Sequence, residues 1–155
     1  MQKSRLGNLI VSIVAILLLS ALVLMYINQN KAEYLPDTTP QNVVHNYVLS
    51  LNQENYERAY NYLSSEHTQI TLTDFEQALS ERKSEIKNSN ITISRILDGD
   101  DAIVLQLNIR KNYESSLLTD PDLYNEFGQL VKENGEWKIS SMPEPYWPEE
   151  WLPEF

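Results

Sequence analysis

The sequence predicts an α+β domain that follows one N-terminal transmembrane helix. Apolar residues recur with the period of a helix between residues 40 and 87, and alternate with the period of a strand between residues 89 and 142. Helices that come first and antiparallel strands that follow are typical of helices packed on one face of a sheet. With 155 residues and no cysteine, the chain is expected to form one domain held by core packing alone.

A stretch of 22 residues, 6–27, contains no charged side chain. As a helix it would rise about 33 Å, enough to cross a hydrocarbon core of about 30 Å. No small-x-small cleavage site follows it, so we expect an uncleaved signal anchor rather than a cleaved signal peptide. Lys3 and Arg5 predict that residues 1–5 stay in the cytoplasm and that the domain lies outside the cytoplasmic membrane.

The part of the chain beyond Ala32 is strongly acidic. It contains all 22 acidic residues and 9 of the 12 basic ones, a formal charge of −13. Binding to nucleic acid or to anionic lipid headgroups depends on lysine and arginine, so both are poor partners for this part of the chain, and no nucleic-acid partner is expected.

Three helices are expected after a polar linker over residues 28–39. Thr39 suits an N-cap and Pro40 the first helical position, and a second short helix follows residues 52–55. Thr73 and Glu76 form a capping-box pattern that starts the third helix. The buried faces predicted for the three helices are Val43, Val44, Tyr47, Val48 and Leu51; Tyr56, Ala59, Tyr60 and Leu63; and Phe75, Ala78, Leu79 and Ile86.

Two hairpins are expected next. Ile91, Ile93 and Leu97 share one face of a strand that turns at residues 98–101 into a second strand, in which residues 103, 105, 107 and 109 alternate. Residues 113–126 are assigned to a loop. Asn134-Gly135 is the preferred pair for a type I′ turn and places Leu130 opposite Ile139 and Lys132 opposite Trp137, in strands 127–132 and 137–142.

Residues 40–142 resemble the nuclear transport factor 2-like superfamily, also called cystatin-like. The resemblance rests on residues 40–51, on the run Asn55-Tyr56-Glu57-Arg58-Ala59-Tyr60-Asn61-Tyr62-Leu63, on Asp74-Phe75, and on Gly135-Glu136-Trp137-Lys138-Ile139. It implies a cone-shaped fold, in which a curved sheet wraps around helices and leaves a pocket. The chain is also similar to small, membrane-anchored, exported members of uncertain function, and no catalytic residue is carried over.

Neither histidine is expected to be catalytic. His45 points away from the apolar face of its helix, and His67 follows Ser65 in sequence without the spatial arrangement of a nucleophile and its base. Asp98, Asp100 and Asp101 lack the ligand spacing of a calcium loop, so a solvated turn is the favoured interpretation. No catalytic residue, metal ligand or cofactor site is predicted.

The ligand-pocket candidates are polar or aromatic side chains of the predicted cone: Tyr47, Tyr60, Phe75, Gln106, Asn108 and Trp137. A tyrosine can pack its ring in a core while its hydroxyl reaches a cavity, although helical spacing favours ordinary core packing. Gln106, Asn108 and Arg110 share one strand face, which either meets water or lines a polar pocket.

The tail, residues 143–155, combines proline, aromatic and acidic residues. One interpretation folds it back over its own domain, and we favour this because large exposed apolar patches are uncommon. The other presents Trp147, Trp151 and Phe155 to a partner as aromatic anchors.

These observations favour a noncatalytic, membrane-tethered binding or assembly module that contacts a protein or a small apolar ligand outside the membrane. The partner would be another protein or a second copy. One alternative is a small-molecule enzyme with an acid or base in the cone. The other is an accessory subunit of a larger membrane complex.

Overall fold

The computed structural model describes residues 12–14, 16–21, 32–67, 69–97, 99, 102–111, 123–148 and 151. The chain divides into two compact units, Met1–Glu33 and Tyr34–Phe155. In the first unit, residues 12–14 and 16–21 are helical, and the remainder of the predicted span 6–27 lies outside the described residues. Within the described residues, no helix is long and apolar enough to cross a membrane.

Helix α2, Pro40–Asn52, begins as predicted. The Thr39 hydroxyl accepts a hydrogen bond from the backbone N–H of Asn42 at 3.3 Å and caps the helix. The predicted apolar face is confirmed, since Val43, Val44, Tyr47 and Leu51 are buried. The structure also buries two polar residues of this helix, Asn46 and Ser50, that the apolar pattern did not single out.

Helix α3, Tyr56–Tyr60, is shorter than predicted. It begins at the expected place, where the Asn55 side chain accepts a hydrogen bond from Arg58 N–H at 3.1 Å. Leu63 does not continue the helix, because the backbone at this point pairs with strand β4. Ser64 N–H donates to Ile139 O and Ile139 N–H donates to Tyr62 O, each at 2.8 Å. A short 3₁₀ turn, Ser65–His67, follows.

The third predicted helix is two helices, α4 at Leu72–Glu81 and α5 at Lys83–Lys87. Its predicted N-cap, Thr73, is wrong by two residues. The cap is Thr71, whose hydroxyl accepts from Asp74 N–H at 3.2 Å and donates to the Asp74 carboxylate at 2.7 Å. The two threonines each precede an acidic residue at the same spacing, and the structure uses the first.

Four antiparallel strands form one sheet in the order β1-β2-β3-β4. Strand β1 is Ser89–Leu97 and β2 is Ala102–Lys111. A bulge between Ile93 and Arg95 reverses the alternation in β1. Ile96 therefore packs against the core and Leu97 is 47% exposed, which corrects the predicted inward position of Leu97.

Strand β3, Leu123–Glu133, and strand β4, Glu136–Ser141, form the second hairpin. The predicted register is confirmed, with Leu130 opposite Ile139 and Lys132 opposite Trp137. The turn residues Asn134 and Gly135 have φ values of 51° and 88°. The prediction of a loop through residue 126 is wrong in its last part, because residues 123–126 pair with β2.

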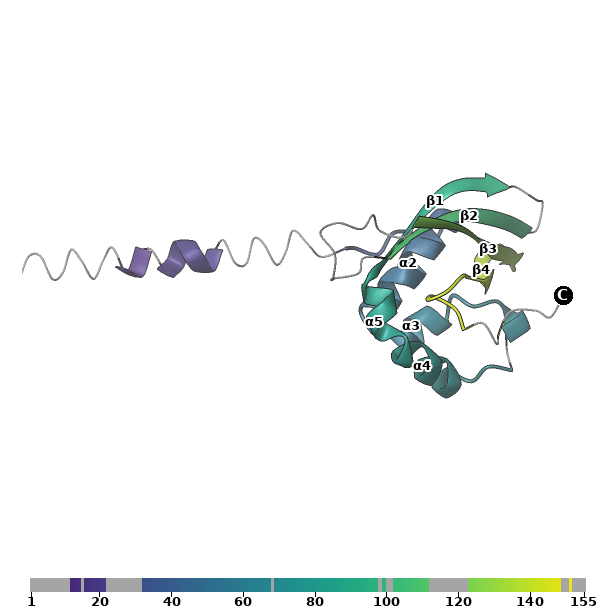
Figure 1. Cartoon of the computed structure of the whole chain (residues 1–155), viewed down its shortest axis with the longest axis horizontal. Coiled ribbons are helices and arrows are strands. Elements are labelled where there is room, and N and C mark those ends of the chain that lie inside the picture. Colours follow the sequence, from purple (N-terminus) through teal and green to yellow (C-terminus); the bar gives the residue numbers. More distant parts are fainter. Residues whose placement is uncertain are drawn as a thin grey trace, which may run out of the picture. The chain divides into compact units, whose positions relative to one another are not determined.

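The helices α2 to α5 lie on one side of the sheet in Figure 1, with α2 in contact with β4 and α5 with β1. Ile103, Leu105, Leu107 and Ile109 of β2 point into this layer and are buried. The tail adds to the same core, since its residues Tyr146 and Trp147 are at most 1% exposed, as is Met142 just before it. The α+β class is confirmed.

Candidate functional site

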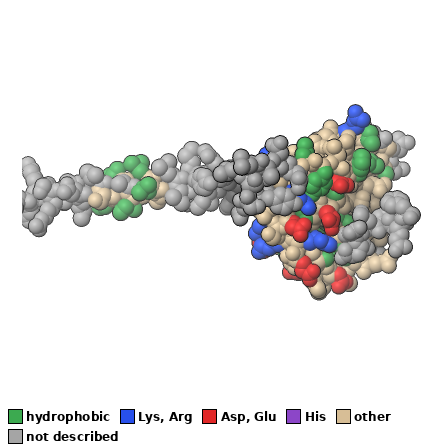
Figure 2. All heavy atoms as spheres, viewed as in Figure 1, with side chains coloured by type: hydrophobic (Ala, Val, Ile, Leu, Met, Phe, Trp, Pro, Cys, Tyr) green, Lys and Arg blue, Asp and Glu red, His purple; other side chains and the backbone are tan. Residues whose placement is uncertain are grey.

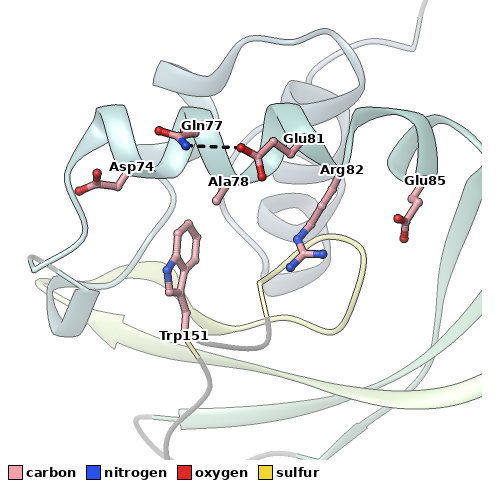
Figure 3. Close-up of a pocket in the computed structure, with 7 residues that line it drawn as sticks. All are labelled: Asp74, Gln77, Ala78, Glu81, Arg82, Glu85 and Trp151. Atoms are coloured by element: carbon pink, nitrogen blue, oxygen red, sulfur yellow. Dashed lines mark hydrogen bonds between the residues drawn. The ribbon is translucent and has the colours of Figure 1, made fainter.

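A groove runs along one face of helices α4 and α5 and is closed on one side by the tail (Figure 3). Its volume is about 420 Å³. The helical residues that line it follow each other at intervals of three and one, so they share one face. The lining is Asp74, Gln77, Ala78, Glu81, Arg82, Glu85 and Trp151.

Trp151 is held in place by other aromatic rings. Its indole stacks on the buried ring of Phe75, with centroids 5.8 Å apart and an angle of 17° between the planes. The edge contact with Trp147 has a centroid distance of 5.6 Å, and the backbone N–H of Trp151 donates to Pro148 O at 3.1 Å. Trp151 is half-buried, so part of its indole is open to the groove in Figure 3.

The groove is acidic. Asp74, Glu81 and Glu85 supply three exposed carboxylates, and Arg82 supplies one guanidinium. Arg82 also lies 3.6 Å from the Glu144 carboxylate at the start of the tail. The amide of Gln77 donates to Glu81 at 3.4 Å, which lies on the groove wall in Figure 3. An aromatic surface beside carboxylates suits cationic groups.

A second groove of about 320 Å³ lies between α3, strand β4 and the segment that precedes α2. Arg58 lies over the ring of Tyr34 at 3.4 Å, and the Tyr62 hydroxyl donates to the Asp37 carboxylate at 3.2 Å. Trp137 and Lys138 complete its wall with Asn61 and Glu136. Its lining contains two acidic and two basic side chains, so their formal charges cancel.

The predicted ligand-pocket residues do not form one site. Tyr47 is fully buried and its hydroxyl donates to Tyr146 O at 2.7 Å, while the Tyr60 hydroxyl donates to Ile70 O at 2.6 Å. Phe75 contacts Tyr60 edge to face, with centroids 5.5 Å apart. The structure thus brings Tyr60 and Phe75 together beneath the first groove.

The other three pocket candidates lie elsewhere. Trp137 lines the second groove. Gln106 and Asn108 alternate with the buried residues of β2 and therefore lie on the face of the sheet that points away from the helices. Of the partner-contact candidates, Trp147 is buried, Trp151 lines the first groove, and Phe155 lies outside the described residues, as do Asp98, Asp100 and Asp101.

One histidine is exposed, and the other contacts a buried tryptophan. His45 is exposed on α2. The Nε2 atom of His67 lies 2.6 Å from Ser140 O, and its ring contacts Trp147 at a centroid distance of 4.9 Å.

Burial raises the pKa of Tyr47 and of Tyr146, so both hydroxyls stay neutral.

Sequence reasoning missed the polar lining of both grooves. Asp74, Gln77, Glu81 and Glu85 form a stripe next to the apolar stripe of α4, a pattern that a solvated helix face shares. This polar stripe becomes one wall of a groove only because Trp151 packs beside it, on Phe75. Phe75 and Trp151 are more than 70 residues apart in the sequence.

No protein-family model matches the sequence, and no curated protein is significantly similar to it. Among solved structures, a SEC-C motif containing protein from Rhodopseudomonas palustris is 9% identical, with a TM-score of 0.51 over 69% of this chain and 79% of its own. A protein described as a candidate calcium/calmodulin-dependent protein kinase type II association domain, from Thiobacillus denitrificans, is 8% identical, with a TM-score of 0.50 over 72% of this chain and 100% of its own.

A nuclear transport factor 2-like protein of unknown function from Shewanella oneidensis is 12% identical, with a TM-score of 0.45 over 63% of this chain and 88% of its own. Other neighbours are named as nuclear transport factor 2-like or cystatin-fold proteins. At these identities the similarity is one of fold alone.

Proposed function

We propose that this chain is a noncatalytic binding module that is tethered to the cytoplasmic membrane and contacts a protein partner on the outer side. The tether would be residues 6–27, which contain no charge, and Lys3 and Arg5 would keep the N-terminus inside. The domain Tyr34–Phe155 is a compact unit of its own, as expected for a body on a tether.

The observation that carries the binding role is the half-buried indole of Trp151 in the groove along α4 and α5. Aromatic rings held by packing at the wall of a groove are frequent anchors in protein interfaces. Because Asp74, Glu81 and Glu85 line the same groove as this ring, the partner surface that fits it carries lysine or arginine.

An enzymatic role would need an acid or base in a desolvated pocket. The groove carboxylates are exposed, and the tyrosines whose pKa burial raises, Tyr47 and Tyr146, belong to the packed core rather than to either groove lining. This distribution favours binding over catalysis.

Topology is tested by adding protease to spheroplasts that contain the full chain. We expect digestion of residues 34–155 and retention of an N-terminal fragment in the membrane pellet. Protection of residues 34–155, or release of the intact chain from the membrane by alkaline extraction, would overturn the tethered arrangement.

Partner binding is tested in cells with a photo-crosslinking amino acid at Gln77, inside the groove, and at Glu57, an exposed position on α3, as the matched control. We expect an adduct of one defined mass at Gln77 that is absent at Glu57. The adduct should be lost when Trp151→Ala or Glu81→Lys is introduced. Equal crosslinking at both positions, or an adduct that survives both variants, would exclude the groove as the binding site.

A further inference from the structure

Strand β1, Ser89–Leu97, lies at one edge of the sheet. Among the described residues it pairs with β2 alone, and Figure 1 shows it at the rim of the sheet, with no labelled element beyond it. The nine residues of β1 include no proline, so each carries a backbone N–H. The N–H and C=O groups that point away from β2 therefore form no bond within the described sheet and can pair with a further strand.

The opposite edge of the sheet is closed by the chain itself. Leu63 pairs with Ile139 of β4 in a parallel bridge, and the backbone of Ile139 bonds to Tyr62 and Ser64. Strand β1 is longer than β4, nine residues against six, and lacks such a cover among the residues that the structure describes. Proteins usually cover or shorten their edge strands, because a long free edge pairs with other chains. The edge of β1 is thus the edge at which this sheet can accept another strand.

The apolar side chains of β1 are covered incompletely. Ile91, Ile93 and Ile96 face the helices and pack against the core, yet each remains only half-buried. The inward-facing residues of β2, between 103 and 109, are at most 3% exposed. Strand β2 has a neighbour on both sides and β1 on one side, which accounts for the difference. An added strand with an apolar side chain at every second position would cover the open flank of these isoleucines.

This edge is basic although the domain is acidic. Strands β1 and β2 contain no acidic residue. Arg110 lies opposite Asn90, and Arg95 lies opposite Gln106, so both exposed guanidinium groups are on the face of the sheet that points away from the helices. In Figure 2 the acidic side chains of the visible face gather mainly over the helices, and the rim of the sheet carries basic ones. Because physiological salt screens charges beyond about 8 Å, these arginines act on a strand bound at this edge more strongly than distant carboxylates do.

We propose that the edge of β1 binds an extended segment of another protein as an added strand, with apolar residues at every second position and acidic residues between them. Backbone hydrogen bonds to residues 89–93 supply the affinity, since the bulge between Ile93 and Arg95 interrupts the regular edge. The apolar side chains of the segment cover Ile91 and Ile93. Its acidic side chains face Arg95 and Arg110, whose positions differ by four residues of β2, about 13 Å along the sheet. This binding involves neither groove and does not depend on the membrane tether.

A second copy of this chain is a poorer occupant of the same edge. If two β1 edges paired, Arg95 and Arg110 of both copies would lie along one joined edge, where like charges repel. An acidic segment instead places opposite charges beside both arginines. The charge of this edge therefore favours a partner of different sequence.

The proposal is tested on the full chain in detergent with a synthetic peptide of the length of β1, in which valine alternates with glutamate. The control peptide has lysine in place of glutamate and should bind about tenfold more weakly or worse. At saturation the glutamate peptide should slow the hydrogen exchange of backbone amides within residues 89–93 and leave that of β4 unchanged. Equal affinity for the two peptides, or exchange that stays fast at residues 89–93, would overturn the proposal. Protection of these residues that rises with protein concentration in the absence of peptide would show pairing with a second copy and would also overturn it.

Two further measurements separate strand addition from other contacts. Methyl groups on the backbone nitrogens of either the valines or the glutamates remove the donors of one edge of the peptide, so one methylated peptide should lose binding and the other should keep it. In the protein, Arg95→Glu should weaken binding about tenfold. Lys132→Glu, an exposed basic position on β3, is the matched control and should have little effect. Binding by both methylated peptides, or equal losses from Arg95→Glu and Lys132→Glu, would contradict strand addition at β1.

The same assay distinguishes this site from the groove along α4 and α5. Trp151→Ala removes the aromatic wall of that groove and should leave the affinity for the glutamate peptide unchanged. Loss of peptide binding in Trp151→Ala would place the peptide in the groove and refute binding at β1.

Discussion

The buried side-chain amide of Asn46 makes both backbone hydrogen bonds of Leu35. Its Oδ1 atom accepts from Leu35 N–H at 2.8 Å, and its Nδ2 atom donates to Leu35 O at 2.6 Å and to the Asp37 carboxylate at 2.5 Å. The Tyr62 hydroxyl reaches the same carboxylate at 3.2 Å. Residues 34–37 are therefore fixed to α2, and the compact unit begins at Tyr34 instead of at residue 40, within the predicted linker.

Replacing Asn46 tests this attachment. Asn46→Ala leaves the polar backbone groups of Leu35 without their partner and opens a small cavity beside α2, so we expect a loss of about 2 kcal/mol in the free energy of unfolding. The control is Gln41→Ala, on the exposed side of the same helix, which should stay within about 0.5 kcal/mol of the unaltered chain. Denaturant unfolding followed by tryptophan fluorescence measures both, and equal effects would show that the Asn46 amide adds no stability.

The tail can be tested as part of the core. Trp147 is 1% exposed, and we expect Trp147→Ala to cost about 3–5 kcal/mol, as for other buried aromatic residues. Phe127→Ala, at a 57% exposed aromatic position, should cost less than about 0.5 kcal/mol. Because the Trp147 indole N–H is buried without a described partner, Trp147→Phe should cost much less than Trp147→Ala. Calorimetric melting of the three variants would refute core packing of the tail if Trp147→Ala melted like Phe127→Ala.

Local patterns predicted most of the fold. The Thr39 cap, the apolar face of α2 and the register of the Asn134-Gly135 hairpin follow from residues a few positions apart. The predictions failed where two local sequence patterns were equivalent, or where the structure depends on pairing between segments that are distant in sequence. Thr71 and Thr73 fit the same capping pattern, and nothing local marks the bulge that turns Leu97 outward.

The candidate sites were less predictable than the fold. The groove along α4 exists because Trp151 stacks on Phe75, and the second groove exists because Asp37 is held by Asn46 and Tyr62. Each of these contacts joins distant segments through side chains that local periodicity does not distinguish from solvated or core residues. Trp137 and Trp151 were nevertheless singled out by residue type, and each lines one groove.

The β3–β4 turn offers a test of backbone conformation alone. Gly135 has φ of 88°, and a Cβ atom added there would meet no other atom within 4 Å. Gly135→Ala should therefore lower the free energy of unfolding by about 1 kcal/mol through backbone strain only. Asn134→Gly, at φ of 51°, should be close to neutral because glycine adopts this conformation freely. A neutral Gly135→Ala would mean that the turn adopts another conformation in solution.

Glu54 predicts a pH dependence of stability. Its carboxylate accepts hydrogen bonds from the ammonium groups of Lys83 and Lys87, each at 2.7 Å, and these bonds lower its pKa from 4.5 to about 2. A carboxyl whose pKa is lower in the folded state stabilises the fold fully above its unfolded pKa and loses this contribution as the pH falls through the folded value. The stabilising effect of Glu54 should therefore be constant above about pH 5 and disappear towards pH 2.

This dependence is measured as the difference in free energy of unfolding between the unaltered chain and Glu54→Gln at a series of pH values. The difference should shrink from about pH 5 to about pH 2, and it should be smaller in high salt because the group is exposed and screened. Glu76→Gln, an exposed carboxyl on α4, is the matched control and should give a much smaller change over the same range. If the Glu54→Gln difference stayed constant down to pH 2, the two lysines would not hold this carboxylate in solution, and the link between α5 and the end of α2 would rest on apolar packing alone.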